Sequence, residues 1–449
     1  MTLGDTSRPT GIGGRLERIC GPGFARPAGG ADEVAGRQAR WVAMPGSPNA
    51  AADVLRLAAE HDLSVVPRGA GTKLDWGAPP VQVDVLLDTG RLAGIWHRSP
   101  GERTAEVGAG TPVRAVQAML ERSGYRLPVD VRSAGATVGG VVAADEAGPL
   151  RHRHGSPCSQ VTEVSYVDAA GQLLRAGGVP ASRAGELAPL LCGSQGALGV
   201  LISATVRVQE VPTHRLWVLR PVWTPLEVHN LVGEILASAV MPAAIEVDLP
   251  AAGPGPERPP VYPPERAGHP AGTGRAGRAV PPRRSGSLAV LVEGGPAEVA
   301  ERARRLGRIL GATARSMTEA PSWWRRYPFA GDDVALRIEV PIGDLHAAVY
   351  ALRDAAGAPV AVRGSAGLGV VHAALPATTP PPRVAGLLTA VRDVLMARSG
   401  RCVVLAAPPE IRRAVDLWGD LPDLSLLRRI KDRYDPEHRL APGRFPGGL

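Results

Sequence analysis

The sequence predicts an α+β protein with two domains and a C-terminal segment. Up to about residue 210, short apolar runs typical of strands alternate with amphipathic helical patterns. Residues 253–286 break this pattern, because they are dense in Pro, Gly and Arg and contain almost no aliphatic side chains. A second series of strands and helices follows the break. At 449 residues, the chain is long enough for two or three domains.

The first predicted domain covers residues 36–213. Residues 1–35, which precede it, are rich in Gly and Arg, and we expect them to be flexible and loosely ordered. Ser47 and Pro48 predict the start of a helix, since Ser is a favoured N-cap and Pro a favoured first helical residue. The remaining predicted elements are strands at 65–67, 83–87, 104–107 and 161–167 and a helix that follows Thr111 and Pro112 and ends at Gly124.

The second predicted domain covers residues 214–420 and contains the break at 253–286 as a flexible insertion. Strands are expected at 288–292 and 334–340, and helices at 298–310 and 345–354. Residues 421–449 form a last helix, from Leu424, and a tail rich in Pro and Gly. We expect this segment to return to the first domain.

Composition excludes several classes of function. The formal net charge is +8, but Arg supplies nearly all the cations, since only Lys73 and Lys431 are lysines. Aromatic residues make up 4% of the chain and the Arg residues are dispersed, which argues against a nucleic-acid surface. No apolar run reaches the length of about 18 residues that a membrane span needs, and no signal-peptide pattern is present. The four cysteines have no metal or cluster spacing, so we expect reduced thiols in a cytoplasmic protein.

A glycine-rich turn, Arg68-Gly69-Ala70-Gly71-Thr72, directly follows the first apolar strand. Two glycines around one small residue let the backbone approach a ligand and present several N–H groups to one anion, such as a pyrophosphate. A Rossmann site would need a helix directly after the turn, and Pro79 and Pro80 prevent one. The turn therefore predicts a phosphate loop of another type, with an ordinary glycine turn as the alternative.

Three further segments accompany this turn: 136–143 (ATVGGVVA), 151–155 (RHRHG) and 192–200 (CGSQGALGV). In this order and spacing, the four segments resemble the FAD-binding domain of the vanillyl-alcohol oxidase / p-cresol methylhydroxylase superfamily, over about residues 38–212. The whole chain, with its ending at 430–436 (IKDRYDP) and 442–445 (PGRF), is most similar to the smaller FAD-binding subunit of bacterial glycolate oxidases. The resemblance implies an FAD-binding domain of p-cresol methylhydroxylase type, built from two α/β subdomains and followed by an α+β cap domain for the substrate.

The resemblance also implies how FAD is held. The turn would bind the pyrophosphate through backbone N–H groups, and Thr137 to Gly140 would form the opposite wall. Gly155 would lie near the flavin ring, and Gly199 and Val200 near the adenine. Thr72 stands after Gly71, where covalent relatives carry His or Cys nearby, so non-covalent FAD is expected. The implied FAD-binding residues are Pro67, Arg68, Gly69, Ala70, Gly71, Thr72, Ala136, Thr137, Val138, Gly139, Gly140, Ala143, Gly155, Gly199 and Val200.

Two residues are candidates for substrate chemistry. His154 lies in the basic segment 151–155, which could bind a carboxylate or stabilise reduced flavin, or could be a solvated basic turn. Arg337 lies on a predicted strand and could pair with a substrate carboxylate, or could form a structural ion pair. Related catalytic subunits carry a His-x-Gly-Asp-Gly-Asn-x-His motif for a metal, and only His372 remains of it here. We therefore predict no metal site and expect His372 in the core or an interface.

The resemblance implies an FAD-binding subunit of a glycolate oxidase-like 2-hydroxy-acid oxidoreductase. It would pass electrons to a larger flavoprotein subunit and an iron–sulfur subunit, through which it could also sit at a membrane surface. One alternative is a stand-alone FAD-dependent alcohol or hydroxy-acid dehydrogenase. The other is a structural subunit with a degenerate flavin pocket, because segment 179–187 is short and Cys158-Ser159 replaces an Arg-Asp pair.

Overall fold

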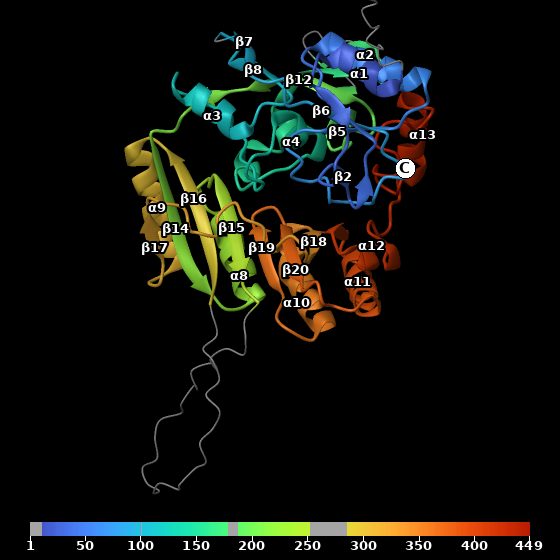
Figure 1. The fold of residues 1–449 in the computed structure, drawn as a ribbon. Coiled ribbons are helices and arrows are strands. Elements are labelled where there is room, and N and C mark those ends of the chain that lie inside the picture. The colour runs from blue at the N-terminus through green and yellow to red at the C-terminus, as the bar shows by residue number, and fades with distance from the viewer. Residues whose placement is uncertain (1–10, 100, 178–186, 252–284) are drawn as a thin grey trace, which may run out of the picture.

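The computed structural model describes residues 11–99, 101–177, 187–251 and 285–449 (Figure 1). It contains both helices and sheets, which confirms the predicted α+β class. The predicted insertion at 253–286 lies outside the described residues except for its last two, and segment 179–187 lies outside except for Leu187. None of the helices in the described ranges is both long and apolar enough to cross a lipid bilayer.

The first sheet carries the glycine turn. Its order is β1-β4-β6-β5, with β4, β6 and β5 parallel and β1 antiparallel at the edge. Helices α1 and α2 pack on it, and the Ser47 hydroxyl accepts the Ala50 N–H at 3.1 Å, which confirms the predicted helix start. The bounds are β1 (Ala25–Pro27), β4 (Trp41–Ala43), β5 (Val65–Arg68), β6 (Val85–Asp88), α1 (Ile12–Cys20) and α2 (Pro48–Glu60).

The expectation that residues 1–35 are loosely ordered is wrong for residues 11–35. Helix α1 buries Leu16 and Cys20 against α2 and the sheet, so a short amphipathic pattern inside a Gly- and Arg-rich segment is enough to order it. Strand β1 and a small hairpin of β2 (Glu33–Val34) and β3 (Arg37–Gln38) complete this region.

The second sheet is antiparallel, in the order β11-β10-β12-β8-β7, and α3 and α4 pack against it. The basic segment expected to be a loop forms a one-turn helix, α5. The bounds are β7 (Ile95–Ser99), β8 (Thr104–Gly108), β9 (Tyr125–Arg126), β10 (Val161–Val167), β11 (Leu173–Gly177), β12 (Val200–Arg207), β13 (Gln209–Glu210), α3 (Val113–Glu121), α4 (Val138–Ala144), α5 (Arg151–His154), α6 (Pro157–Gln160) and α7 (Leu187–Leu191).

The third sheet, which we call the cap sheet, has eight strands in the order β17-β14-β16-β15-β19-β20-β18-β21, and all its neighbouring strands are antiparallel. Helices α8 to α11 pack against one of its faces, and Figure 1 shows this layer below the first two sheets. The bounds are β14 (His214–Val222), β15 (Ala244–Leu249), β16 (Gly286–Gly294), β17 (Arg315–Met317), β18 (Val334–Glu339), β19 (Ala361–Ser365), β20 (Val370–Leu375), β21 (Arg401–Ala406), α8 (Pro225–Ala237), α9 (Pro296–Leu310), η2 (Ile342–Asp344), α10 (Leu345–Ala356), α11 (Pro381–Met396) and α12 (Pro409–Ala414).

The chain ends back at the first sheet. Helix α13 (Leu424–Tyr434) leads into a tail in which Leu440 pairs with Val65 of β5. The Lys431 side chain is fully buried, and its Nζ donates to the backbone oxygens of Ala197 at 2.8 Å and Leu440 at 2.7 Å. This buried contact fixes the tail against the segment that carries Gly196 and Gly199.

Candidate functional site

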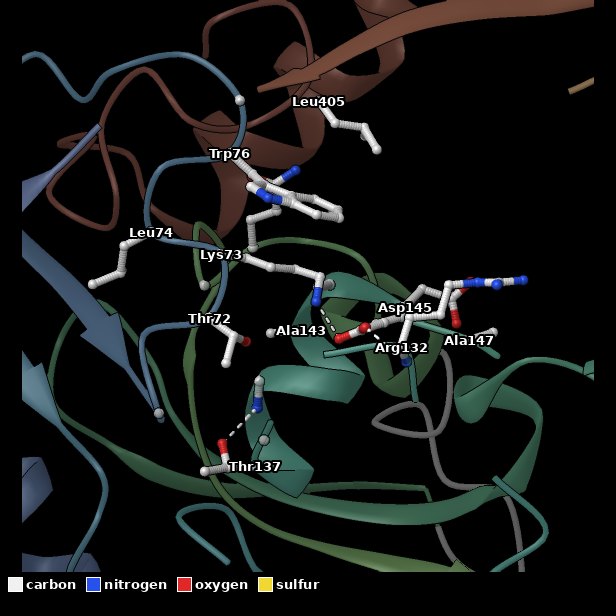
Figure 2. Close-up of a pocket in the computed structure, with 18 of the residues that line it drawn as sticks. Thr72, Lys73, Leu74, Trp76, Arg132, Thr137, Ala143, Asp145, Ala147 and Leu405 are labelled. Carbon is white, nitrogen blue, oxygen red and sulfur yellow. Dashed lines mark hydrogen bonds and ion pairs between the residues drawn. The ribbon is translucent and has the colours of Figure 1, made fainter. Parts of the chain in front are cut away.

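A cavity lies between the first two sheets and the cap sheet (Figure 2). The glycine turn and α4 form one wall, and strands β18, β20 and β21 contribute to the other. Its empty volume is about 1700 Å³, with the open mouth included. The cavity is therefore an open cleft between the two sides.

The glycine turn lines the cavity and contains backbone donors without a partner. The N–H groups of Ala70, Gly71 and Thr72 have no hydrogen-bond partner among the described residues. A Cβ atom at residue 69 would overlap the Thr137 hydroxyl, so only glycine lets the turn approach α4 this closely. Several free N–H groups on one turn form a binding site for an anion.

Helix α4 lies directly beside the turn on the same side of the cavity. Thr137 is its N-cap, and the Thr137 hydroxyl accepts the Gly140 N–H at 3.3 Å. The Gly139 N–H donates to the Ala109 oxygen at 2.8 Å, and a Cβ at residue 139 would lie 2.7 Å from the Ala109 Cβ. Thus two glycines, Gly69 and Gly139, allow the close packing of the turn, α4 and Ala109 that forms this side of the cavity.

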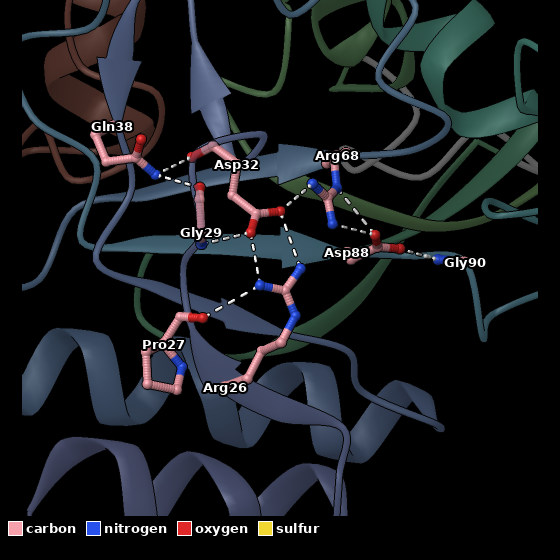
Figure 3. A network of polar contacts seen from close by, with 8 residues as sticks. All are labelled: Arg26, Pro27, Gly29, Asp32, Gln38, Arg68, Asp88 and Gly90. Carbon is pink, nitrogen blue, oxygen red and sulfur yellow. Dashed lines mark hydrogen bonds and ion pairs between the residues drawn. The ribbon is translucent and has the colours of Figure 1, made fainter.

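The Arg68 side chain takes part in an ion-pair network outside this cavity (Figure 3). Its guanidinium donates to Asp88 at 2.9 Å and to Asp32 at 3.0 Å, and Asp32 also accepts from Arg26 at 2.6 Å. Arg26 is the main cause that holds the pKa of Asp32 far below its usual range. The network ties the glycine turn to the N-terminal hairpin, so Arg68 contributes backbone rather than side-chain charge to the cavity.

A buried carboxylate, Glu146, joins segments from both sides of the cavity. It forms an ion pair with Lys73 and accepts the Ser133 N–H at 2.8 Å and the Tyr327 hydroxyl at 3.2 Å. Figure 2 shows Lys73 pointing across the cavity toward the loop of Asp145 and Ala147. Burial lowers the pKa of Lys73 while Glu146 opposes that change, and burial raises the pKa of Tyr327 well above its usual value.

A second buried ion pair also links the two sides. The Arg132 guanidinium donates to Glu246 of β15 at 2.8 Å, and both side chains are almost fully buried. Burial raises the pKa of Glu246. Burial is also the largest single effect on Arg132, where it lowers the pKa, but the charge and hydrogen bond of Glu246, with smaller contributions from other groups, together raise it. Such a pair fixes geometry, because either partner alone would be a buried charge.

The cap sheet places a row of polar side chains across neighbouring strands. In register, Asp248 of β15 pairs with Arg363 of β19, Arg363 with His372 of β20, and His372 with Arg337 of β18. Both His372 and Arg337 line the cavity, and Arg337 also forms an ion pair with Glu339. Burial, followed by Arg132 and Arg337, holds the pKa of His372 well below its usual value, so the ring is neutral.

The structure brings most of the predicted site residues to this cavity. Those that line it are Pro67, Arg68, Gly69, Ala70, Gly71, Thr72, Thr137, Gly139, Gly140, Ala143, Gly199 and Arg337. Ala136, Val138 and Val200 do not line it, because their side chains are buried in the cores beneath. Gly155 also lies outside the lining; it has φ +79° and ends α5, which is the reason for a glycine there.

The structure does not place His154 in the lining of the cavity. It lies on α5 outside the cavity lining, and the charges that act on it are those of Arg126, Glu293 and Arg153. The Nε2 atom of His154 is buried without a hydrogen-bond partner among the described residues. Because α5 is a helical turn rather than a loop, its basic side chains do not all point toward the cavity; Arg151 lines it and His154 does not.

We expect His154→Gln to reduce the decrease in the free energy of unfolding at acidic pH. Burial lowers the pKa of His154 from 6.5 to about 4. The pKa of His154 is lower in the folded protein than in the unfolded chain, so the unfolded chain takes up a proton first as the pH falls. The folded state therefore loses stability as the pH falls from the unfolded pKa toward about 4. Urea unfolding between about pH 7 and about pH 5 should show a smaller loss for His154→Gln than for the wild type. The exposed His97→Gln is the control, and parallel curves for all three proteins would refute the assignment.

Sequence reasoning missed several cavity residues: Trp76, Arg132, Glu146, Tyr327 and Trp418, and it placed His372 in the core or an interface rather than in the cavity wall. One signal for Lys73 was present. Only two lysines occur among the 51 Lys and Arg residues; Lys431 is fully buried, and the Lys73 side chain is only 13% exposed in its ion pair with Glu146. The rarity of lysine in this Arg-rich chain could therefore have pointed to both ion pairs.

Comparison with known proteins agrees with this site. Residues 39–177 match the family model described as an FAD binding domain. The chain is 31% identical over 174 residues to D-2-hydroxyglutarate dehydrogenase of Xanthomonas citri pv. viticola, covering 38% of this chain and 37% of the relative. It is 35% identical over 162 residues to glycolate oxidase subunit GlcE of Escherichia coli K12, covering 35% of this chain and 46% of that subunit. The chain thus spans less than half the length of either relative.

A solved structure shares the fold over most of the chain. Alkyldihydroxyacetonephosphate synthase superposes with a TM-score of 0.63 over 92% of this chain and 78% of its own, at 16% identity. At this identity the likeness shows the fold alone. The cap sheet, which lies beyond the family match, is therefore part of a known architecture.

Proposed function

Because residues 39–177 form an FAD-binding domain, we propose that this protein is an FAD-dependent oxidoreductase that acts on 2-hydroxy acids. The observation that carries the proposal is the cavity itself. An anion-binding turn with free N–H groups faces a sheet whose cavity side presents a guanidinium and a neutral imidazole. The relatives named dehydrogenases and oxidases of hydroxy acids support the same reading.

The residues present fit FAD. The free N–H groups of Ala70, Gly71 and Thr72 would hold the pyrophosphate, and Gly69 allows this turn to pack closely against the N-terminal end of α4. Thr72 has no nucleophilic imidazole or thiol to form a bond with the flavin, so we propose that FAD is bound non-covalently. When bound, FAD supplies a hydride acceptor.

The side chains of the cap sheet would bind and orient the substrate. The Arg337 guanidinium would pair with the carboxylate, since it lines the cavity and a guanidinium matches that geometry. His372 lies beside it in register, and its buried Nδ1 has no partner among the described residues. Its low pKa leaves the ring neutral, so Nδ1 can accept a hydrogen bond from the substrate hydroxyl.

We propose further that the protein works as a subunit. Its four cysteines are free and do not lie in a group that could hold a metal in the part of the chain that the structure describes. Electrons would then leave through partners, and the identity to glycolate oxidase subunit GlcE supports a larger flavoprotein subunit and an iron–sulfur subunit as those partners. A stand-alone dehydrogenase is the second candidate, favoured by the identity to D-2-hydroxyglutarate dehydrogenase.

Reduction of the bound flavin tests the activity. The FAD-loaded chain, mixed with glycolate, lactate or 2-hydroxyglutarate without oxygen, should lose its visible flavin absorbance with at least one of them. Arg337→Met should raise the half-saturating substrate concentration about tenfold or more, because a charge-assisted hydrogen bond is lost. The exposed Arg308→Met on α9 is the control and should behave as the wild type. Flavin that stays oxidised with every hydroxy acid, in the presence and absence of the partner subunits, would refute the activity.

A further inference from the structure

Aromatic side chains are rare in this protein, and one group of them lies at the cavity. The chain has only 8 Trp, 6 Tyr and 3 Phe. Trp76, Tyr327 and Trp418 line the cavity, and Phe329 stacks on Tyr327 with ring centroids 4.8 Å apart. Trp76 meets Tyr327 edge to face at 5.3 Å. In so aromatic-poor a chain, this arrangement indicates a binding surface for apolar groups.

Edge strand β21 adds aliphatic side chains to the same surface. Residues Val403, Val404 and Leu405 of β21 line the cavity. Alternation along the strand leaves the Val403 and Leu405 side chains half-buried, while Cys402 and Val404 belong to the core on the helix side. The Gly77 N–H donates to the Leu405 oxygen at 2.7 Å, which brings the Trp76 loop beside β21. Figure 2 shows Trp76 and Leu405 on the same side of the cavity. We call Trp76, Val403, Leu405 and Trp418 the apolar wall.

The apolar wall borders the proposed carboxylate site. In register, Arg337 of β18 lies between His372 of β20 and Val403 of β21. A ligand whose carboxylate pairs with Arg337 therefore meets a polar side chain on one side and an apolar surface on the other. Val403, Leu405 and Trp418 are partly exposed in the structure, so a ligand can bury apolar area against them.

We propose that the apolar wall selects 2-hydroxy acids that carry an aliphatic or aromatic side chain over glycolate, which carries none. This proposal rests on the proposed function and names its substrate class. In the reaction, the C–H bond at the carbon that bears the hydroxyl breaks and its hydride would pass to the flavin, while the O–H bond breaks and its proton passes to water. The product is the 2-oxo acid, in which the same apolar side chain still contacts the wall.

The expected preference follows from buried area. A hydrophobic pocket discriminates by roughly 10- to 200-fold for one methylene group that it buries. The FAD-loaded wild type should therefore favour 2-hydroxyisocaproate over glycolate by at least about tenfold in the second-order rate constant of anaerobic flavin reduction. Both enantiomers are used.

Two variants test the wall, and one serves as a control. Leu405→Ala and Trp418→Ala should each lower the ratio of the two rate constants by about tenfold, since each removes apolar contact area. Met396→Ala, an exposed side chain at the end of α11, should leave the ratio unchanged. Binding of 2-oxoisocaproate and glyoxylate, followed by the shift of the flavin spectrum, is a second readout that needs no turnover. If Trp418→Ala does not fold, the ratio of rate constants measured for Leu405→Ala alone tests the role of the apolar wall.

The possible failures can be told apart. If no hydroxy acid reduces the flavin, the proposed function is wrong and this inference fails with it. If glycolate is the better substrate, or if Leu405→Ala keeps the wild-type ratio in both readouts, only the assignment of the apolar wall is overturned.

Discussion

Ala70→Asp is expected to weaken FAD binding by at least about 100-fold, whereas Ala70→Asn keeps most of the affinity. Ala70 lies exposed in the glycine turn, and its N–H is one of the free donors that face the cavity. A carboxylate at this residue would repel a pyrophosphate bound to the turn, since two unit charges about 5 Å apart repel each other by about 3 kcal/mol at an effective dielectric constant of about 20. Asn has the same shape without the charge, so the pair of variants isolates electrostatics.

The measurement is a titration of apoprotein with FAD, followed by quenching of flavin fluorescence. Far-ultraviolet circular dichroism and the urea midpoint should match the wild type for both variants, because residue 70 is exposed and makes no hydrogen bond in the described structure. Equal FAD affinity for Ala70→Asp and Ala70→Asn would show that the turn does not face the pyrophosphate.

Lys431→Met should lower the free energy of unfolding by about 3–5 kcal/mol. The Lys431 side chain is fully buried, and so is its partner Asp435, at 2.6 Å. Removing the cation leaves a buried carboxylate without its charge partner and two backbone oxygens without a donor. The loss should also free the C-terminal tail from β5, which Leu440 pairs with at Val65.

Urea unfolding measures this effect, and limited proteolysis measures the release of the tail. Arg433→Met, on the exposed side of the same helix, is the matched control and should stay within about 0.5 kcal/mol of the wild type. Adding Asp435→Asn to Lys431→Met should recover part of the loss, because the unpaired charge is removed. A loss below about 1 kcal/mol for Lys431→Met would contradict the buried anchor.

Local patterns accounted for much of the fold. The Ser47 cap, the strand at 161–167 and the last helix from Leu424 appear where periodicity and capping chemistry predicted them. The glycine turn and the start of α4 could also be predicted from local sequence, because positions where backbones approach closely require glycine. The order of residues 11–35 was missed, since a helix that buries only a few side chains is hidden in a Gly-rich composition.

The rest of the site depends on contacts between distant segments. Glu146 meets Lys73 and Tyr327, and Arg132 meets Glu246, across separations of 73 to 181 residues. No local pattern specifies such pairs, because each half is an ordinary charged residue until the sheets face each other. The two histidines His154 and His372 show that local sequence context also misjudged which side chains line the cavity. The basic context favoured His154, while strand register across the cap sheet brings His372 to the cavity.

The most direct test of the FAD site is the absorption spectrum of the purified full-length chain after incubation with FAD and removal of free cofactor by gel filtration. We predict a yellow protein with about one flavin per chain. Denaturation should release all of that flavin, because FAD is proposed to bind non-covalently. A colourless protein that stays colourless after incubation, while remaining folded by circular dichroism, would contradict the FAD site.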